Sequence, residues 1–143
     1  MRFSLDTNIL VEVLRRRNTA SRAAFSRAVL TGQPLVASIL VHHELLFGVA
    51  MHPEPDVERR NVQRLMDQIA IEPFNRGDFE TAAIVRADLR RRGLSIGPYD
   101  VLIASQALSR GWTILTSNVR EFSRVSKLQI ADWPETRELW TQL

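Results

Sequence analysis

Four acidic residues stand where their carboxylates could act together. Asp6 ends the first apolar run of the chain, and Glu121 follows a later apolar run, together with Asn118. Glu44 lies inside a long apolar pattern with helical spacing, and Asp100 follows a Gly-Pro pair that opens another helical pattern. Carboxylates at the ends of parallel strands meet at one edge of a sheet, where α/β proteins bind their ligands.

A cluster of carboxylates favours a hard metal ion. Like charges that lie close together raise one another's pKa unless a cation neutralises them. Oxygen ligands fit Mg²⁺, with Mn²⁺ as the alternative, and the chain has no cysteine to bind Zn²⁺. His42 and His43 precede Glu44 without any zinc-binding spacing, which favours surface or packing roles for them.

The basic residues are suited to phosphate. Of the 19 basic residues all except Lys127 are arginine, whose guanidinium binds phosphate through two hydrogen bonds. Runs at 15–17, 59–64 and 90–92 are candidate RNA contacts, although a GC-rich genome or helix-end cations would explain them equally well. Together with a hard metal, this composition indicates phosphodiester chemistry.

Each acid also has a purely structural interpretation. Asp6, followed by Thr7 and Asn8, suits the N-cap of a helix. Glu44 could form a salt bridge with one of the many arginines, and Asp100 could stabilise the first turn of its helix through the helix dipole. The residues alone leave both interpretations open.

The elements that must position these acids alternate between strands and helices. Short apolar runs predict strands at 2–5, 35–37, within 69–73, at 113–116 and at 128–130. Helical spacing predicts helices at 8–17, 18–31, 38–52, 56–69, 78–92, 98–111 and 118–122, with a short helix after Pro134. This order predicts an α/β fold with a central parallel sheet of four to five strands covered on both faces. The helix around Glu44 is apolar nearly all round, which predicts that it is buried.

The bulk properties limit where the chain acts. Its 143 residues predict a single domain over 1–143. We expect no membrane span, because no run of about 20 apolar residues occurs. The absence of cysteine and of a signal-peptide pattern favours the cytoplasm. The net charge of +3 permits an RNA partner.

The acids lie in four motifs that resemble those of PIN-domain nucleases, and the resemblance is greatest to VapC-type toxins of bacterial toxin–antitoxin pairs. These motifs are Leu5-Asp6-Thr7-Asn8, the helix around Glu44, residues 97–104 and residues 116–122. The resemblance implies a three-layer α/β/α fold, usually dimeric, and a Mg²⁺-dependent endoribonuclease that cuts structured RNA, often tRNA. It also implies inhibition by a VapB-type antitoxin. In the resulting toxin–antitoxin complex, only the antitoxin would contact operator DNA.

The resemblance assigns roles to individual residues. Asp6, Glu44 and Asp100 match the acidic triad, with Asp6 and Asp100 as direct metal ligands, and Glu121 matches a fourth catalytic acid. Asn118 stands where many members carry another Asp, so one negative charge is absent from a second metal site. Four polar residues of the same motifs are expected to support the acids through hydrogen bonds, namely Thr7, Asn8, Thr116 and Asn118. The alternative is a non-catalytic PIN-like module that binds RNA or protein, and Asn118 is the feature that favours it.

Overall fold

The computed structural model describes residues 2–15 and 20–132, which form a five-stranded sheet with helices on both sides. Every strand pair is parallel, and the strand order is β3-β2-β1-β4-β5. The strands are β1 (Phe3–Leu5), β2 (Leu35–Ser38), β3 (Ala70–Glu72), β4 (Thr113–Leu115) and β5 (Gln129–Ala131). The predicted parallel sheet is therefore confirmed.

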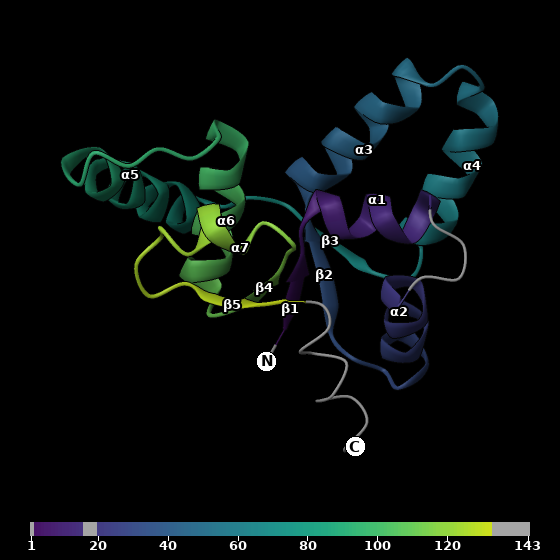
Figure 1. The fold of residues 1–143 in the computed structure, drawn as a ribbon, viewed down its shortest axis with the longest axis horizontal. Coiled ribbons are helices and arrows are strands. Elements are labelled where there is room, and N and C mark those ends of the chain that lie inside the picture. The colour runs from purple at the N-terminus through teal and green to yellow at the C-terminus, as the bar shows by residue number, and fades with distance from the viewer. Residues whose placement is uncertain (1, 16–19, 133–143) are drawn as a thin grey trace.

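The helices separate into two groups around the sheet. Figure 1 shows the first four on one side, where α3 and α4 form a hairpin that projects away from the strands, and the last three on the other. The helices are α1 (Thr7–Arg15), α2 (Ala20–Leu30), α3 (Ile39–Met51), α4 (Pro55–Met66), α5 (Arg76–Arg91), α6 (Pro98–Arg110) and α7 (Val119–Phe122). This is the predicted three-layer α/β/α architecture.

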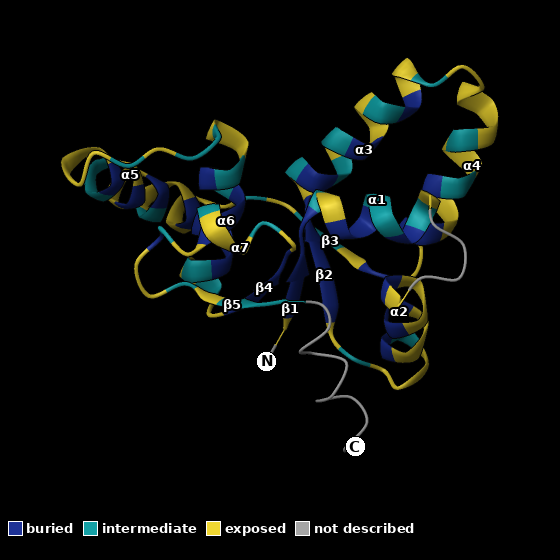
Figure 2. Cartoon of the chain, in the orientation of Figure 1, coloured by how far each residue is buried: buried dark blue, intermediate teal, exposed yellow. Residues whose placement is uncertain are grey.

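The hydrophobic core lies between the sheet and these helices. Every residue of β1, β2 and β4 is buried, as the dark blue strands of Figure 2 show. Continuous apolar strands of this kind are expected where both faces of a parallel sheet are covered. The core fixes the strand ends, so the residues that follow those ends have defined positions.

The register brings three of these strand ends together. In β1, Leu5 pairs with Leu115 of β4, and Ser4 pairs with Val36 of β2. The backbone N–H of Asp6 donates to the carbonyl of Leu115 at 3.0 Å, which continues the β1–β4 ladder by one step. The first residues after β1, β2 and β4 therefore lie side by side at one edge of the sheet.

Two predicted helix starts are wrong by one or two residues. Helix α4 begins at Pro55 after an N-cap at Glu54, rather than at Asp56, because proline is favoured in the first turn. Helix α5 begins at Arg76 after Asn75, and Asp78 is the third helical residue of a capping box. The Asn75 side chain accepts from the N–H of Asp78, while the Asp78 carboxylate accepts from the N–H of Asn75.

The prediction that the whole of α3 is buried is also wrong. Its inner face is buried against the core, whereas Phe47 is 63% exposed and Met51 is 71% exposed. The α3–α4 hairpin leaves the sheet after its first turns, so no other described element forms a layer over the outer face of α3 (Figure 1). A helix that is apolar on all sides is expected to have apolar contacts, but the pattern does not identify the part of the molecule that provides them.

Two further expectations concern the ends and the surface of the chain. The predicted short helix after Pro134 lies outside the described residues, as do residues 16–19, where the first predicted helix ends. Within the described residues, no helix combines the length and the apolar character that a membrane crossing requires.

Candidate active site

Asp6 directly follows β1 and is 4% exposed. One carboxylate oxygen, Oδ1, accepts a hydrogen bond from the backbone N–H of Thr7 at 2.8 Å. The other, Oδ2, accepts from the hydroxyl of Thr116 at 2.9 Å. Asp6 therefore accepts one hydrogen bond at the first residue of α1 and another from the residue that follows β4.

Glu44 is half-buried in the middle of α3 and lies close to Asp6. Its Oε1 accepts a hydrogen bond from the hydroxyl of Thr7 at 3.0 Å. Thr7 thus donates to both carboxylates, through its N–H to Asp6 and through its hydroxyl to Glu44. Within the described residues no arginine or lysine forms a salt bridge with Glu44, which removes the salt-bridge interpretation there.

Asp100 occupies the first turn of α6 and faces the same space. Burial raises the pKa of its carboxyl to about 6, and the negative charges of Asp6 and Glu121 contribute to the rise. The preceding Gly97 is the N-cap, and a Cβ at that position would lie 3.2 Å from the Oδ2 of Asp100. The sequence analysis did not predict that Gly97 leaves space for the Asp100 carboxylate, although a glycine three residues before a motif acid was a visible signal.

Glu121 and Asn118 lie on and before the short helix α7, which follows β4. The side-chain amide of Asn118 donates to Oε2 of Glu121 at 3.1 Å, and its backbone N–H donates to the hydroxyl oxygen of Thr116 at 2.9 Å. Because the Thr116 oxygen accepts from Asn118, its own proton is directed to Asp6. Asn118 therefore orients Glu121 directly and Asp6 through Thr116.

The four acids together form one cluster, which we call the acid pocket (Asp6, Glu44, Asp100 and Glu121). Burial raises the pKa of Asp6 above its ordinary value, the hydrogen bonds from Thr116 and Thr7 oppose the rise, and the charge of Glu44 adds to it. Among the described residues, none of the four forms an ion pair with arginine or lysine. In that part of the chain, Asp6, Glu44 and Glu121 instead accept hydrogen bonds from hydroxyl and N–H donors.

The acid pocket fits a hydrated hard cation better than a closed metal centre. Among the described residues, no group of three or more acidic or histidine side chains is arranged to hold a metal ion by itself. Mg²⁺ usually takes one or two carboxylates, several waters and the phosphates of its substrate. Carboxylate oxygens from Asp6 and Asp100, close enough to repel each other, match that requirement.

Some predicted residues lie apart from the acid pocket. Asn8 is exposed on α1 and lines a separate shallow cavity of about 390 Å³ with Val11, Glu12 and Arg15. Of the arginine runs, 59–64 lies along α4 and 90–92 at the end of α5, where Arg92 pairs with Asp88 at 2.6 Å. Only Arg15 of the run 15–17 is among the described residues.

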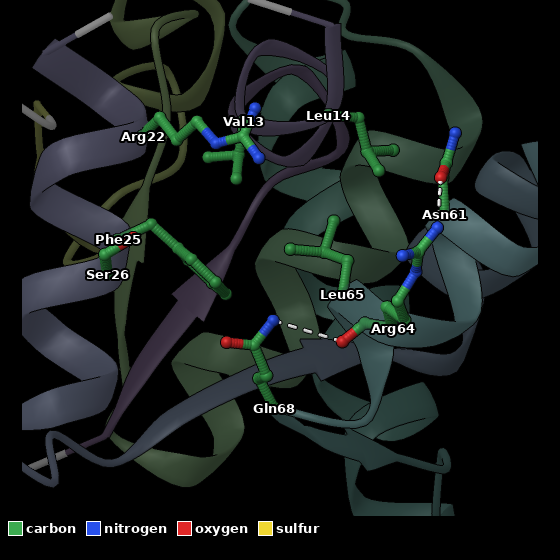
Figure 3. A pocket seen from close by; sticks show the side chains of 9 residues that line it. All are labelled: Val13, Leu14, Arg22, Phe25, Ser26, Asn61, Arg64, Leu65 and Gln68. Carbon is green, nitrogen blue, oxygen red and sulfur yellow. Dashed lines mark hydrogen bonds between the residues drawn. The ribbon is translucent and has the colours of Figure 1, made fainter. Parts of the chain in front are cut away.

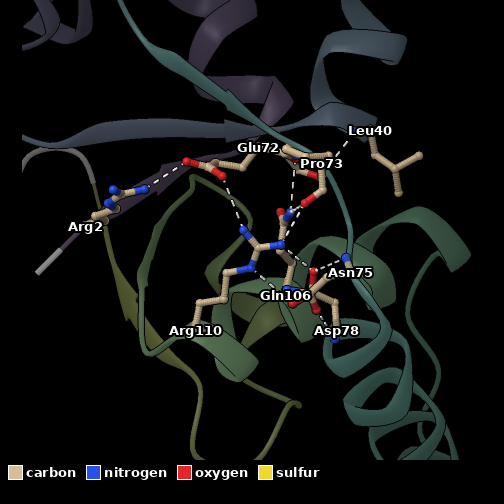
Figure 4. A network of polar contacts seen from close by, with 9 residues as sticks. Arg2, Leu40, Glu72, Pro73, Asn75, Asp78, Gln106 and Arg110 are labelled. Carbon is tan, nitrogen blue, oxygen red and sulfur yellow. Dashed lines mark hydrogen bonds and ion pairs between the residues drawn. The ribbon is translucent and has the colours of Figure 1, made fainter.

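A second cluster of acids is neutralised by arginine (Figure 4). We call it the arginine network (Arg2, Glu72, Asp78 and Arg110). Arg110 at the end of α6 contacts Asp78 at 2.6 Å and Glu72 at 3.3 Å, and Arg2 contacts Glu72 at 2.8 Å. The sequence analysis missed this network, because its members are separated by at least 32 residues except for Glu72 and Asp78.

One large cavity is also separate from the acid pocket. It has a volume of about 820 Å³ and lies between α1, α2 and α4. Figure 3 shows Phe25 and Leu65 pointing into it, with Arg22, Arg64 and Gln68 around them. It contains none of the eight predicted site residues, so its size identifies no catalytic role.

Comparison with known proteins identifies the family to which the chain belongs. The family model described as the PIN domain matches residues 4–128. A Shigella flexneri protein named tRNA(fMet)-specific endonuclease VapC is 30% identical over 93% of this chain and 98% of its own.

Two solved structures have the same fold. The Rickettsia felis VapBC2 structure, bound to a DNA fragment from its promoter, superposes with a TM-score of 0.87 at 26% identity, covering 93% of this chain and 99% of that one. The DNA-bound VapBC of Salmonella typhimurium gives 0.86 at 28% identity, covering 93% and 98%. The chain therefore belongs to the PIN-domain family, within its VapC group of ribonucleases.

Proposed function

We propose that this chain is the toxin of a type II toxin–antitoxin pair and cuts the phosphodiester bonds of cellular RNA, with tRNA as the substrate. The acid pocket is the observation that carries the proposal, because it places four carboxylates from four segments together without a basic partner among the described residues. The named activity of the Shigella flexneri relative supports tRNA. Inhibition of translation and of growth would follow from loss of tRNA.

Asp6 and Asp100 would hold a Mg²⁺ ion, for which Mn²⁺ could substitute. When bound, the ion would neutralise charge on the phosphodiester and favour in-line attack by water. Glu44 or Glu121 would accept the proton of the attacking water, and either could help hold a second ion. Thr7, Thr116 and Asn118 keep the carboxylates oriented through the hydrogen bonds described above, which limits the reorganisation needed during the reaction.

The toxin's partners follow from the same relatives. A VapB-type antitoxin would bind and silence the chain, and contact with operator DNA would occur only through the antitoxin. The DNA-bound VapBC complexes of Rickettsia felis and Salmonella typhimurium support a toxin–antitoxin complex that binds DNA. Exposed apolar side chains on α3 support pairing with a second copy of the chain. We expect a single domain over 1–143 that acts in the cytoplasm, where its RNA substrate is found.

Brief expression of the wild type and of Asp6→Ala, followed by sequencing of RNA 5′ ends, tests the proposal. The wild type should produce new 5′ ends at defined positions in tRNA and stop growth, and co-expressed antitoxin should suppress both effects. Asp6→Ala should produce neither effect at equal soluble abundance. A wild type that binds RNA without producing new ends would instead support the non-catalytic PIN-like module.

A further inference from the structure

We propose that Tyr99 and His43 form a stacking site for an unpaired RNA base next to the bond that is cut. This inference rests on the proposed function. Tyr99 is 46% exposed at the start of α6, and His43 is exposed on α3. Their ring centroids are 5.9 Å apart with an interplanar angle of 75°, so the edge of one ring meets the face of the other.

The two rings are placed by the same helices that carry the acids. His43 immediately precedes Glu44 on α3, and Tyr99 immediately precedes Asp100 on α6. Successive residues of a helix point about 100° apart, so each ring lies beside a carboxylate without competing for its place. A nucleotide has a similar offset, because the sugar separates the base from the phosphate. A phosphate at the acid pocket would therefore have its base near the two rings.

The acid pocket explains why an aromatic contact would be useful there. Four carboxylates repel the RNA backbone until a cation is bound. Stacking of a base on an aromatic ring does not depend on the net charge of the site, and every base has a face that can stack. Only an unpaired base offers such a face, which agrees with the way proteins recognise loops and single strands of RNA.

Another exposed aromatic residue shows what this position adds. Phe79 on α5 is 52% exposed, comparable with Tyr99, and its ring lies 5.3 Å from that of Phe74. No acid of the pocket adjoins Phe79 in the sequence, and the described ring contact of Phe79 is with Phe74 rather than with a neighbour of those acids. Exposure and an aromatic neighbour are thus shared, whereas proximity to the acids belongs to Tyr99 and His43. Phe79→Leu is therefore the matched control for Tyr99→Leu.

The experiment measures binding without cleavage. Full-length wild-type protein is titrated, with Mg²⁺ present, into a non-cleavable 2′-O-methyl analogue of a single-stranded RNA dodecamer that carries 2-aminopurine at a central position. Adding Tyr99→Leu should weaken binding about tenfold and reduce the quenching of 2-aminopurine fluorescence. Adding His43→Ala should act in the same direction, while Tyr99→Phe and Phe79→Leu should bind as the parent does. Thermal unfolding of each variant confirms that the fold is retained.

Cleavage kinetics separate this inference from the proposed function. In the otherwise wild-type protein, Tyr99→Leu should raise KM for the RNA about tenfold with a smaller change in kcat. If wild type and Tyr99→Leu cut with equal KM, the stacking site is refuted while the ribonuclease stands. If wild type does not cut but binding still depends on Tyr99, the proposed function fails and the stacking site stands. Loss of self-association or antitoxin binding in Tyr99→Leu, with RNA binding unchanged, would assign the ring to a protein interface and overturn the proposal.

Discussion

The acid pocket and the arginine network contain the same chemical groups in opposite electrostatic states. Asp6 and Asp78 are almost equally buried, at 4% and 1% exposure. Burial alone would raise the pKa of Asp78, but hydrogen bonds from Arg110 and Asn75 and the charge of Arg110 hold it below its ordinary value. Asp6 has hydroxyl and N–H donors instead, and burial leaves its pKa raised.

This difference distinguishes an acid that holds the fold together from the acids to which we assign the proposed function. A carboxylate paired with a guanidinium is neutralised by the protein and joins elements of the fold, as Figure 4 shows for α5 and α6. A buried carboxylate without such a partner among the described residues is unfavourable in the free protein. Such a carboxylate becomes favourable only when a cation binds to it. Perturbed carboxylates of this kind concentrate at functional sites.

The largest expected effect is on catalysis. Asp100→Asn removes one charge from the acid pocket and should lower RNA cleavage about a thousandfold, the scale typical for loss of a preorganised electrostatic group. Gel-resolved cleavage of total tRNA at saturating Mg²⁺ measures this. The matched control is Asp88→Asn, which changes a half-buried acid that pairs with Arg92 and should leave the rate unchanged. Full activity of a soluble Asp100→Asn protein would show that the acid pocket is not the catalytic site.

The next largest effect is on stability and concerns the arginine network. Asp78→Ala removes a fully buried partner of Arg110 and half of the α5 capping box, so it should lower the free energy of unfolding by about 3 kcal/mol. Urea denaturation measures the loss, and the cleavage rate per folded molecule should stay at the wild-type value.

Asp6→Asn provides the comparison for that result. Asp6 is about as buried as Asp78 but has no guanidinium partner among the described residues, so in metal-free buffer Asp6→Asn should cost much less stability than Asp78→Ala. Equal losses for the two variants would mean that the two acids are held in the same way, and this result would contradict the contrast between the two clusters.

The smallest effect is the pH dependence of stability without metal. The pKa of Asp100 in the folded protein is about 6, above its value of about 4 in the unfolded chain. The folded state therefore binds more protons in that window, and the contribution of Asp100 to stability falls as pH rises from about 4 to about 6. Asp100→Asn should remove a fall of about 1 kcal/mol, a figure that allows for solvent screening of this half-buried group.

Asp78 should behave in the opposite way. Its pKa is lowered in the folded protein, so its contribution is present above the unfolded value and is lost as the pH falls through the folded value. Unfolding free energies of wild type, Asp100→Asn and Asp78→Ala between pH 3 and pH 8 measure both trends. The same pH trend in both variants relative to wild type would contradict the assignment.

The sequence predicted the acid pocket better than its surroundings. Asp6 and Asp100 were predictable because short apolar runs and a Gly-Pro helix start indicate where parallel strands and helices begin and end. Glu44 was predictable because an acid among apolar residues requires a partner or a cleft. The register that brings Thr116 to Asp6 could not be read locally, since 110 residues separate them.

Two features depended on tertiary structure alone. The pairing of Asp78 with Arg110 needs the contact between α5 and α6, and the residues that surround Asp78 in the sequence indicate only a helix start. The exposure of Phe47 depends on how far the α3–α4 hairpin projects from the sheet, which an apolar pattern does not encode. In both cases the residue types indicated the kind of contact to expect, but the sequence did not show which residues would make it.

Mg²⁺-dependent thermal unfolding tests the central claim most directly, because it reports on the acid pocket without requiring the RNA substrate. Wild type and Asp88→Asn should both be stabilised as Mg²⁺ is added, by about 2.7 kcal/mol at a hundred times the dissociation constant. Asp100→Asn should show little or no stabilisation over the same range. Equal stabilisation of Asp100→Asn and wild type, or none in a wild type that cuts RNA, would contradict the account.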